Sequence, residues 1–536
     1  MKTRFSMNGF NVIINIIFWM MIAYFAKDSG MGIFFTAYIL YGFLYMILMG
    51  SILNTISKMV SVRCYRGLHE NAKKVFQYGL MYSFIMGLCV CAAFMIFGDL
   101  LTKLLCGSTL PTSILKILGV YFFLQSVSKC LIGFYQGIGN VLTYNITTLL
   151  KDFLLVISAP FIINLFYGYG EKVGALTNNS LYGPAYGAMG AAVLLCMVSL
   201  ITLIMLILFF GRTIHNSNTS VSKSSLRGID DSKSFFNNFI AISFRVLRNN
   251  LFPTTAFFVV LVLYMNIALK NGMNYNTLFT NIGIVFGKLV VVCMIPVCLF
   301  REYVSKEKMK IHNDYNHEET KNVRIRSGYF IKNSLFILLP ITTIAITLAK
   351  PIVMIFFGGH MKLGVSMLQI GGVMILLSGM TMVLKAILTA IQKETVILLY
   401  SLVAFVFTIV FAIVVFGKNT SISMLVYSFV FYYAVSLILF AFAVYTQPRV
   451  ILKDFKYRFI IMGIATALVA GVELLLDYLL VMNILWLILS VLIGYTIYIA
   501  LMFILKGITK RDEQALKDSF LYLPIHFISS KLHLWK

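Results

Sequence analysis

Long apolar stretches separated by short polar breaks run along the whole chain. Each stretch is about 20 residues long, the length that a helix needs to cross the hydrocarbon core of a membrane. The pattern predicts about fourteen membrane-spanning helices, at approximately residues 8–26, 32–55, 75–97, 113–135, 141–166, 185–210, 237–266, 276–300, 328–349, 364–390, 395–416, 422–446, 457–479 and 483–505. Aromatic residues recur near many of their ends, as they do at membrane–water interfaces. The chain is therefore predicted to be an all-α polytopic membrane protein.

Basic residues in the polar breaks predict which of the breaks face the cytoplasm. If the N-terminus is cytoplasmic, the inner segments hold about four times as many Lys and Arg residues as the outer loops. We therefore expect a multi-pass protein of the cytoplasmic membrane with both termini inside. The first apolar stretch is too long for the core of a cleavable signal peptide, and it is expected to remain as a helix.

Composition excludes several classes of protein. Hydrophobic residues make up 60% of the 536 positions and charged residues 12%, against about 25% charged in soluble domains. This balance excludes a soluble enzyme, a disordered chain and a disulfide scaffold. The 8 cysteines fit no metal-binding spacing, and the chain has no phosphate loop or nucleophile constellation, so we expect no enzyme, metal or cofactor. The net charge of +25 is spread over the inner segments, so no nucleic-acid patch is expected.

Three sequence patterns recur about 250 residues apart. The first pair is GFYQGIGNVLTYNITTLL, from Gly133, and AILTAIQKETVILLYSLV, from Ala386. The second pair is FGDLLTKLLCG and LAKPIVMIFFG. The third pair is the two basic loops that precede the members of the second pair. The recurrence predicts two pseudo-symmetric six-helix lobes with a cavity between them, plus two extra helices, although chance similarity among apolar runs is the alternative. The predicted organisation is an N-lobe (1–215), a cytoplasmic linker (216–236), a C-lobe (237–447), the extra helices (448–506) and a cytoplasmic interfacial tail (507–536).

Several motifs resemble those of the multidrug/oligosaccharidyl-lipid/polysaccharide (MOP) exporter superfamily. ISKMVSVRCYRGLHENAKKVFQYGLMYSFIMGL (56–88) resembles its connection between the second and third helices. GFYQGIGN (133–140) resembles its turn after the fourth helix, and YGAMGAA (186–192) its entry to the sixth. A count of fourteen helices favours the polysaccharide-flippase and stage V sporulation protein B-like branches over the twelve-helix drug exporters. The resemblance implies a flippase that works by alternating access between two lobes.

Cationic side chains inside predicted spans are the main candidates for a substrate site. Arg245 and Arg248 lie three positions apart in the seventh span, hence on one helix face, and Lys288 lies near the middle of the eighth. If these spans form an antiparallel hairpin, the three cations can converge on one ligand. A pyrophosphate suits them, because guanidinium groups bind phosphate oxygens in bidentate fashion. The alternative is that the arginines extend toward the cytoplasmic headgroups.

Asparagines in other spans are candidates for binding a glycan. The resemblance implies that the first, second, seventh and eighth helices line the central cavity, where a lipid pyrophosphate meets cationic residues. Asn11 and Asn15 share a face of the first span, Asn54 lies in the second, and Asn249 adjoins Arg248. The first two spans carry asparagines here and arginines in the lipid II flippases, which favours another lipid-linked glycan as the substrate.

Other charged residues inside spans are weaker candidates. Asp152, in the fifth span, is a candidate for coupling transport to a proton or Na⁺, with a hydrogen bond to a neighbouring helix as the alternative. Its neighbour Lys151 points about 100° away around the helix. Lys129 is expected to extend toward the headgroups. Glu473 and Asp477 share a face near the outer end of the thirteenth span, where we expect both to be solvated.

These observations predict a flippase that translocates an undecaprenyl-diphosphate-linked oligosaccharide, either a polysaccharide repeat unit or a peptidoglycan-type precursor, across the cytoplasmic membrane. The expected partners are the lipid-linked glycan, membrane lipids and glycan-synthesis enzymes. The alternative is a MATE-type drug or small-metabolite antiporter, although the first and seventh spans lack the carboxylate that the superfamily's drug exporters use. An integral glycan polymerase or ligase is a third hypothesis, disfavoured because the chain has no large outer loop.

Overall fold

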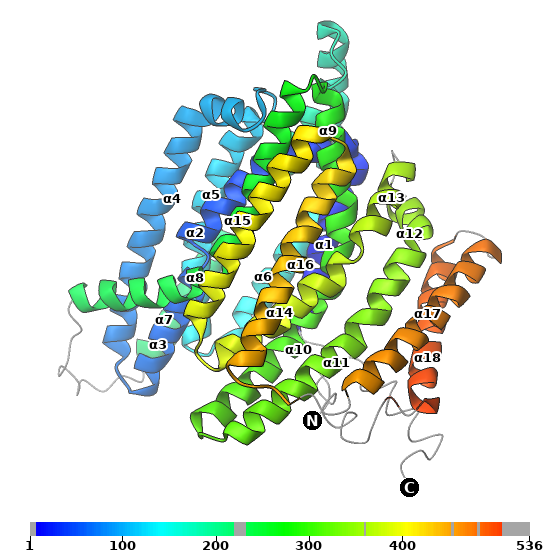
Figure 1. Cartoon of the computed structure of the whole chain (residues 1–536). Helices are drawn as coiled ribbons and strands as arrows, with labels where there is room; N and C mark the ends of the chain where they lie inside the picture. Colours follow the sequence, from blue (N-terminus) through cyan, green and yellow to red (C-terminus); the bar gives the residue numbers. More distant parts are fainter. Residues whose placement is uncertain are drawn as a thin grey trace. The chain divides into compact units, whose positions relative to one another are not determined.

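The computed structural model describes residues 7–218, 232–357, 361–451, 455–479, 483–505 and 507. Every regular element in these ranges is a helix (Figure 1). Thirteen helical stretches are long and apolar enough to cross a membrane, and a shorter apolar helix covers Ile13–Phe25. These stretches coincide with the fourteen predicted spans. The prediction of an all-α polytopic membrane protein is confirmed.

The described helices fall into two compact units, one up to Gly283 (the N-terminal unit) and one from Ile284 onward (the C-terminal unit). The N-terminal unit contains α1 (Met7–Phe25), α2 (Lys27–Leu48), α3 (Ile52–Tyr65), α4 (His69–Cys106), α5 (Thr112–Gly137), α6 (Val141–Thr177), α7 (Tyr182–Asn218), α8 (Ser232–Lys270) and nearly all of α9 (Tyr275–Ile284). The C-terminal unit contains the π-helical turn η1 (Val285–Leu289), α10 (Val290–Asn316), α11 (Thr320–Thr347), α12 (Ala349–Phe356), α13 (Met361–Gly371), α14 (Met374–Ala390), α15 (Glu394–Lys418), α16 (Ile422–Thr446), α17 (Phe455–Leu479) and α18 (Ile484–Ile504).

The boundaries of the predicted lobes stay a prediction. By contacts, α8 and α9 group with the N-terminal helices. Most of the predicted linker, and all of the predicted tail except Gly507, lie outside the described residues.

The turn between α5 and α6 has the same backbone structure as the turn between α14 and α15. Each turn carries one residue with positive φ, Gly139 (82°) and Gln392 (60°), which are 253 positions apart. The next amide, of Asn140 and of Lys393, donates to the carbonyl five residues earlier at 2.9 Å in both turns. This is the hydrogen bond of the Schellman helix end. The local structure therefore supports the predicted repeat at its strongest sequence match.

A second pair of turns also shares this backbone structure. Gly67 (φ 74°) after α3 and Glu318 (φ 60°) after α10 are 251 positions apart. The amides of Leu68 and Glu319 again donate to the carbonyls five residues earlier, at 2.9 and 3.0 Å. Both turns lie in the basic loops that the sequence pairs with each other. Two backbone motifs thus recur at the predicted spacing.

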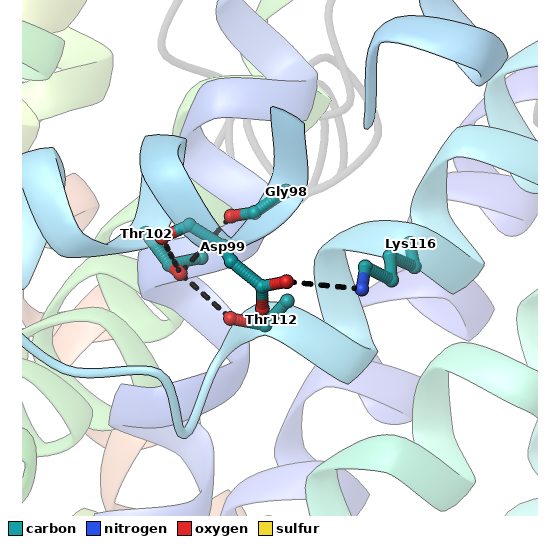
Figure 2. A network of polar contacts seen from close by, with 5 residues as sticks. All are labelled: Gly98, Asp99, Thr102, Thr112 and Lys116. Atoms are coloured by element: carbon teal, nitrogen blue, oxygen red, sulfur yellow. Dashed lines mark hydrogen bonds and ion pairs between the residues drawn. The ribbon is translucent and has the colours of Figure 1, made fainter. Parts of the chain in front are cut away.

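A network of polar contacts joins the C-terminal part of α4 to the start of α5 (Figure 2). The hydroxyls of Thr102 and Thr112 are 2.7 Å apart and buried, and Thr102 also donates to the Gly98 carbonyl at 3.0 Å. The Lys116 Nζ lies 3.4 Å from an oxygen of Asp99, but the Asp99 side chain is exposed and the Lys116 side chain is only half-buried. An exposed ion pair contributes at most about 1 kcal/mol, so the buried hydroxyls carry more of this contact. We assign the network a structural role.

The positive φ angles of the second repeat can be tested by substitution. Replacing Gln392 by Gly is expected to stabilise the protein by up to about 1 kcal/mol, because only glycine adopts this backbone conformation without steric strain. The matched reverse change, Gly139→Gln, is expected to destabilise it by a similar amount. A Cβ at Gly139 would meet no atom within 4 Å, so the effect isolates the backbone. Thermal unfolding of both purified variants measures the difference, and equal midpoints would contradict the assignment.

Candidate functional site

A group of polar and charged side chains lies inside the N-terminal unit. Its members come from three helices: Asn15 from α1, Tyr121 and Lys129 from α5, and Lys151 and Asp152 from α6. We call these five residues the polar cluster. Each lies in a helix that coincides with a predicted span, so the cluster places charged groups within apolar helices.

The polar cluster ties α1 to α6. The Asn15 carboxamide donates to an Asp152 carboxyl oxygen at 3.5 Å, and the Trp19 indole N–H donates to the Asn15 carbonyl oxygen at 3.2 Å. Asp152 is buried, with 7% of its surface exposed. The predicted alternative for Asp152, a hydrogen bond to a neighbouring helix, is present; an ion-coupling role stays a prediction.

Tyrosine rings connect the cluster to α2. Tyr38, Tyr41 and Tyr45 lie on one face of α2, and the Tyr41 ring centroid is 5.2 Å from those of Tyr38 and Tyr121. The Lys151 Nζ stands 5.9 Å from the centroid of the Tyr121 ring, a distance at which the cation is attracted by the ring face.

These contacts form a closed circuit through four helices. Trp19 completes it, because its ring centroid lies 4.7 Å from that of Tyr38. In order, the circuit runs through Asp152, Asn15, Trp19, Tyr38, Tyr41, Tyr121 and Lys151. Asp152 and Lys151, the ends of this series, are joined only because they are neighbours in the chain, whereas each of the five side chains between them is contacted from two sides.

The cluster carries more positive than negative charge. Lys129 and Lys151 are half-buried, and Lys129 interacts electrostatically with both Lys151 and Asp152. Neither lysine forms an ion pair with Asp152 among the described residues. A central Lys or Asp costs roughly 2.5–3.5 kcal/mol on membrane-insertion scales, and two cations with one carboxylate leave one charge uncompensated. The arrangement is suited to an anionic ligand with hydrogen-bonding and ring-stacking groups.

The cations predicted to bind pyrophosphate lie in two different units. Arg245, Arg248 and Asn249 are in α8, and their side chains lie outside the described residues. Lys288 lies in η1, and its side chain is 1% exposed. The convergence of the three cations therefore stays a prediction.

Lys288 is accommodated by a glycine on α13. A Cβ atom at Gly364 would lie 3.1 Å from the Lys288 Cδ and 3.9 Å from its Nζ. Because Gly364 has no side chain, the Lys288 side chain can occupy the space beside it. Single π-helical turns inside α-helices are frequent at functional sites, and η1 carries Lys288.

The predicted glycan-binding asparagines differ in their surroundings. Asn11 is buried, and its carbonyl oxygen has no hydrogen-bond partner among the described residues. Asn15 is engaged by Asp152 and Trp19, whereas Asn54, in α3, is exposed. Of these asparagines, Asn15 is therefore already hydrogen-bonded inside the N-terminal unit, and Asn11 is buried there with its carbonyl oxygen unsatisfied among the described residues.

Sequence reasoning missed the part that tyrosines and lysines play here. Lys129 shares its surroundings with Lys151 and Asp152, and its expected extension toward the headgroups stays a prediction. The spacing of Tyr38, Tyr41 and Tyr45, three and four residues apart, was the available signal for an aromatic face on α2. Nothing in the local sequence marked the pairing of these rings with α5.

Comparison with known proteins supports the fold. No protein-family model matches the sequence, and no curated protein matches it. Among solved structures, a multidrug resistance MATE family transporter of the MOP superfamily in an inward-facing conformation is 13% identical, with a TM-score of 0.59 over 81% of this chain and 94% of that chain. The lipid II flippase MurJ in an inward closed conformation is 15% identical, with a TM-score of 0.60 over 92% and 96%.

A third structure is a MOP superfamily transporter from Pyrococcus furiosus Vc1, described as having a binding pocket of reverse polarity that suggests a different function. It is 15% identical, with a TM-score of 0.55 over 84% of this chain and 94% of that chain. These likenesses show that the chain has the fold of MOP superfamily transporters, and the resemblance drawn from the sequence is confirmed at that level. At such identities they concern the fold alone.

The charge balance of the polar cluster can be tested through Asp152. Replacing Asp152 by Asn is expected to destabilise the protein by roughly 1–3 kcal/mol, because the two lysines lose their nearby carboxylate. A further Lys151→Met change is expected to recover part of this loss, since it removes one of the uncompensated charges. Thermal unfolding in detergent at low salt measures both variants, with Asp477→Asn as a control on α17. An Asp152→Asn protein as stable as the wild type would contradict this account.

Proposed function

We propose that this protein is a membrane transporter that flips an undecaprenyl-diphosphate-linked oligosaccharide from the inner to the outer leaflet by alternating access. The observation that carries the proposal is the pair of half-buried lysines, Lys129 and Lys151, that share a single carboxylate inside the N-terminal unit. The likeness in fold to a lipid II flippase and to MATE family transporters supports a transport role.

The charge of the polar cluster favours a phosphorylated headgroup. A diphosphate carries several negative charges, and ammonium groups bind phosphate oxygens as compact point charges. At about 4 Å, two unit charges attract by roughly 4 kcal/mol where the effective dielectric constant is about 20. An anion that reaches both Lys129 and Lys151 would offset the cost of holding them within the membrane.

The remaining side chains of the cluster suit the sugar part of such a substrate. Tyr41 and Tyr121 carry aromatic rings with polar hydroxyls, the kind of side chain on which sugar rings pack, and in this structure both are buried with their rings against each other. Asn11 and Asn15 offer amide donors and acceptors for sugar hydroxyls, and the Asn11 carbonyl oxygen is unsatisfied among the described residues. In the same proposal, Arg245, Arg248 and Lys288 bind the diphosphate during passage.

Asp152 is the proposed coupling residue. A proton bound to Asp152 would raise the net charge of the polar cluster from +1 to +2, so proton binding and anion binding would favour each other. Such coupling needs no contact between the proton and the substrate. The net positive charge also distinguishes the polar cluster from a site for a cationic drug, because Lys129 and Lys151 would repel such a drug.

The second candidate is a drug or small-metabolite antiporter of the same fold. The contact between Asn15 and Asp152 favours it, because it places a carboxylate, the group that would bind a coupling ion, between α1 and α6. The two lysines argue against it, because they would repel a cationic drug. The structural alignment also argues against it, since the lipid II flippase covers 92% of this chain and the MATE family transporter covers 81%. We place the flippase in the cytoplasmic membrane with both termini inside, beside glycan-synthesis enzymes.

Transport by the purified protein in vesicles tests this proposal. The probe is a polyprenyl-diphosphate oligosaccharide with a fluorescent sugar, whose arrival in one leaflet is followed by chemical quenching. Lys129→Met and Lys151→Met are each expected to slow flipping at least tenfold, because each removes a charge that binds the diphosphate. Lys385→Met is the matched control, since Lys385 is a half-buried lysine in the C-terminal unit whose Nζ stands 5.3 Å from the Phe440 ring centroid.

The predicted arginine site is tested in the same assay. Arg245→Ala, Arg248→Ala and Lys288→Ala are expected to reduce glycan flipping without creating resistance to cationic drugs in cells. Intact flipping in all five variants, together with altered drug resistance, would replace the flippase with the antiporter.

A further inference from the structure

The carboxyl group of Glu473 is buried where three helices of the C-terminal unit meet. Glu473 lies in α17, which packs against α11 and α18. Its side chain is 0% exposed, and neither carboxyl oxygen has a hydrogen-bond partner among the described residues. The prediction that Glu473 is solvated is therefore wrong, because α18 and α11 cover the face of α17 that carries it.

A glycine on α18 makes room for this carboxyl group. A Cβ atom at Gly494 would overlap the Glu473 Oε1 and lie 3.1 Å from its carboxyl carbon. The same Cβ would lie 3.4 Å from the Ile344 Cδ1 of α11, so all three helices meet at this point. Gly494 is the central residue of α18, ten positions from either end. The carboxyl group thus lies against backbone halfway along an apolar helix.

The groups around Glu473 do not supply a positive charge. From α18, the hydroxyl of Tyr498 is buried without a partner among the described residues, while Tyr495 donates to the Ile337 carbonyl of α11 at 3.2 Å. On α11 the charged residue of this region is Lys332, twelve positions before Ile344 and hence about 18 Å along the helix.

On α17 itself the nearest titratable residue is Asp477, one turn away, which is also acidic and only half-buried. Among the described residues no ion pair involves Glu473. The groups named here from α11, α17 and α18 are therefore neutral, acidic or remote, and Lys350 of α12 (Ala349–Phe356), which also packs against α18, is exposed.

An ionised carboxylate in these surroundings would cost several kcal/mol, since it would have neither water nor a counter-charge. A bound proton removes the charge at once. We propose that Glu473 is a proton-binding site that holds α17 against α11 and α18, so that the packing of this helix pair depends on pH. This inference is independent of the transported substrate.

Proton release from Glu473 would require α17 to separate from α18. An ionised carboxyl group would need water, and Glu473 is 0% exposed in the packed arrangement, where its carboxyl group lies against Gly494. The packed state binds one proton more than the separated or unfolded state. By linkage, rising pH must therefore weaken the packing, and falling pH must strengthen it.

The pH dependence of stability tests this site in the full-length protein. Thermal unfolding of the wild type and of Glu473→Gln is measured from about pH 5 to about pH 9, above the usual titration range of an unfolded glutamate. The unfolding equilibrium constant of the wild type is expected to rise, relative to the Gln variant, by up to tenfold per pH unit. Asp477→Asn serves as the control and is expected to keep the pH profile of the wild type.

Other outcomes would overturn the proposal. A stability difference between wild type and Glu473→Gln that does not change with pH would mean that no proton is held there. Stabilisation of the wild type, but not of the variant, by Na⁺ at constant ionic strength would assign the site to a metal cation.

Changing the size of the side chains at Gly494 and Glu473 tests separately whether these two residues face each other. Gly494→Ala is expected to lower the unfolding midpoint in the wild type, because the new methyl group displaces the carboxyl group. The same change should have little effect in a Glu473→Ala background, where that space is empty. Equal effects in both backgrounds would show that Glu473 does not face Gly494.

If Glu473→Gln fails to fold, infrared spectroscopy of the wild type labelled with ¹³C-glutamate decides the question. A protonated carboxyl band that persists at about pH 8 supports the site, since exposed glutamates are ionised there. Loss of that band by this pH would overturn it.

Discussion

The cost of placing charge among apolar helices governs this structure. Most of the chain consists of helices long and apolar enough to cross a membrane, so each polar group inside them must find a hydrogen bond, a counter-charge, a proton or a ligand. The N-terminal unit meets this requirement in part through directional contacts that join Asn15, Asp152 and Lys151 to aromatic rings. What remains after these contacts is net positive charge, and that remainder points to a negatively charged substrate.

Two of the buried acidic residues, Asp152 and Glu473, illustrate two solutions to the same problem. Asp152 lies among lysines and an amide, so its charge is partly compensated by its neighbours. Glu473 lies against the α18 backbone at Gly494 with no donor among the described residues, so a proton is the simplest compensation. The first arrangement suits exchange with a ligand, and the second suits a helix contact that responds to pH.

The sequence predicted the helices well, and two pairs of turns support the predicted repeat, because both features depend on local properties. Apolar length alone marks a spanning helix, and the turns at Gly139 and Gln392 follow from residues next to each other in the chain. Burial was harder to predict, because it depends on the partner helix. No local pattern near Glu473 reveals that Gly494, in the next helix, faces it. The polar cluster likewise combines side chains from separate helices, and only the tyrosine spacing on α2 hinted at it.

Direct binding of inorganic pyrophosphate to the purified full-length protein is the most direct test of the central claim, which is that cationic groups in the N-terminal unit receive an anionic headgroup. Titration calorimetry at low salt is expected to detect binding to the wild type and to Lys385→Met. Affinity at least tenfold lower is expected when Lys129 and Lys151 are both replaced by Met in a protein that still unfolds cooperatively. Equal affinity in that double variant, or no binding to the wild type, would contradict the account.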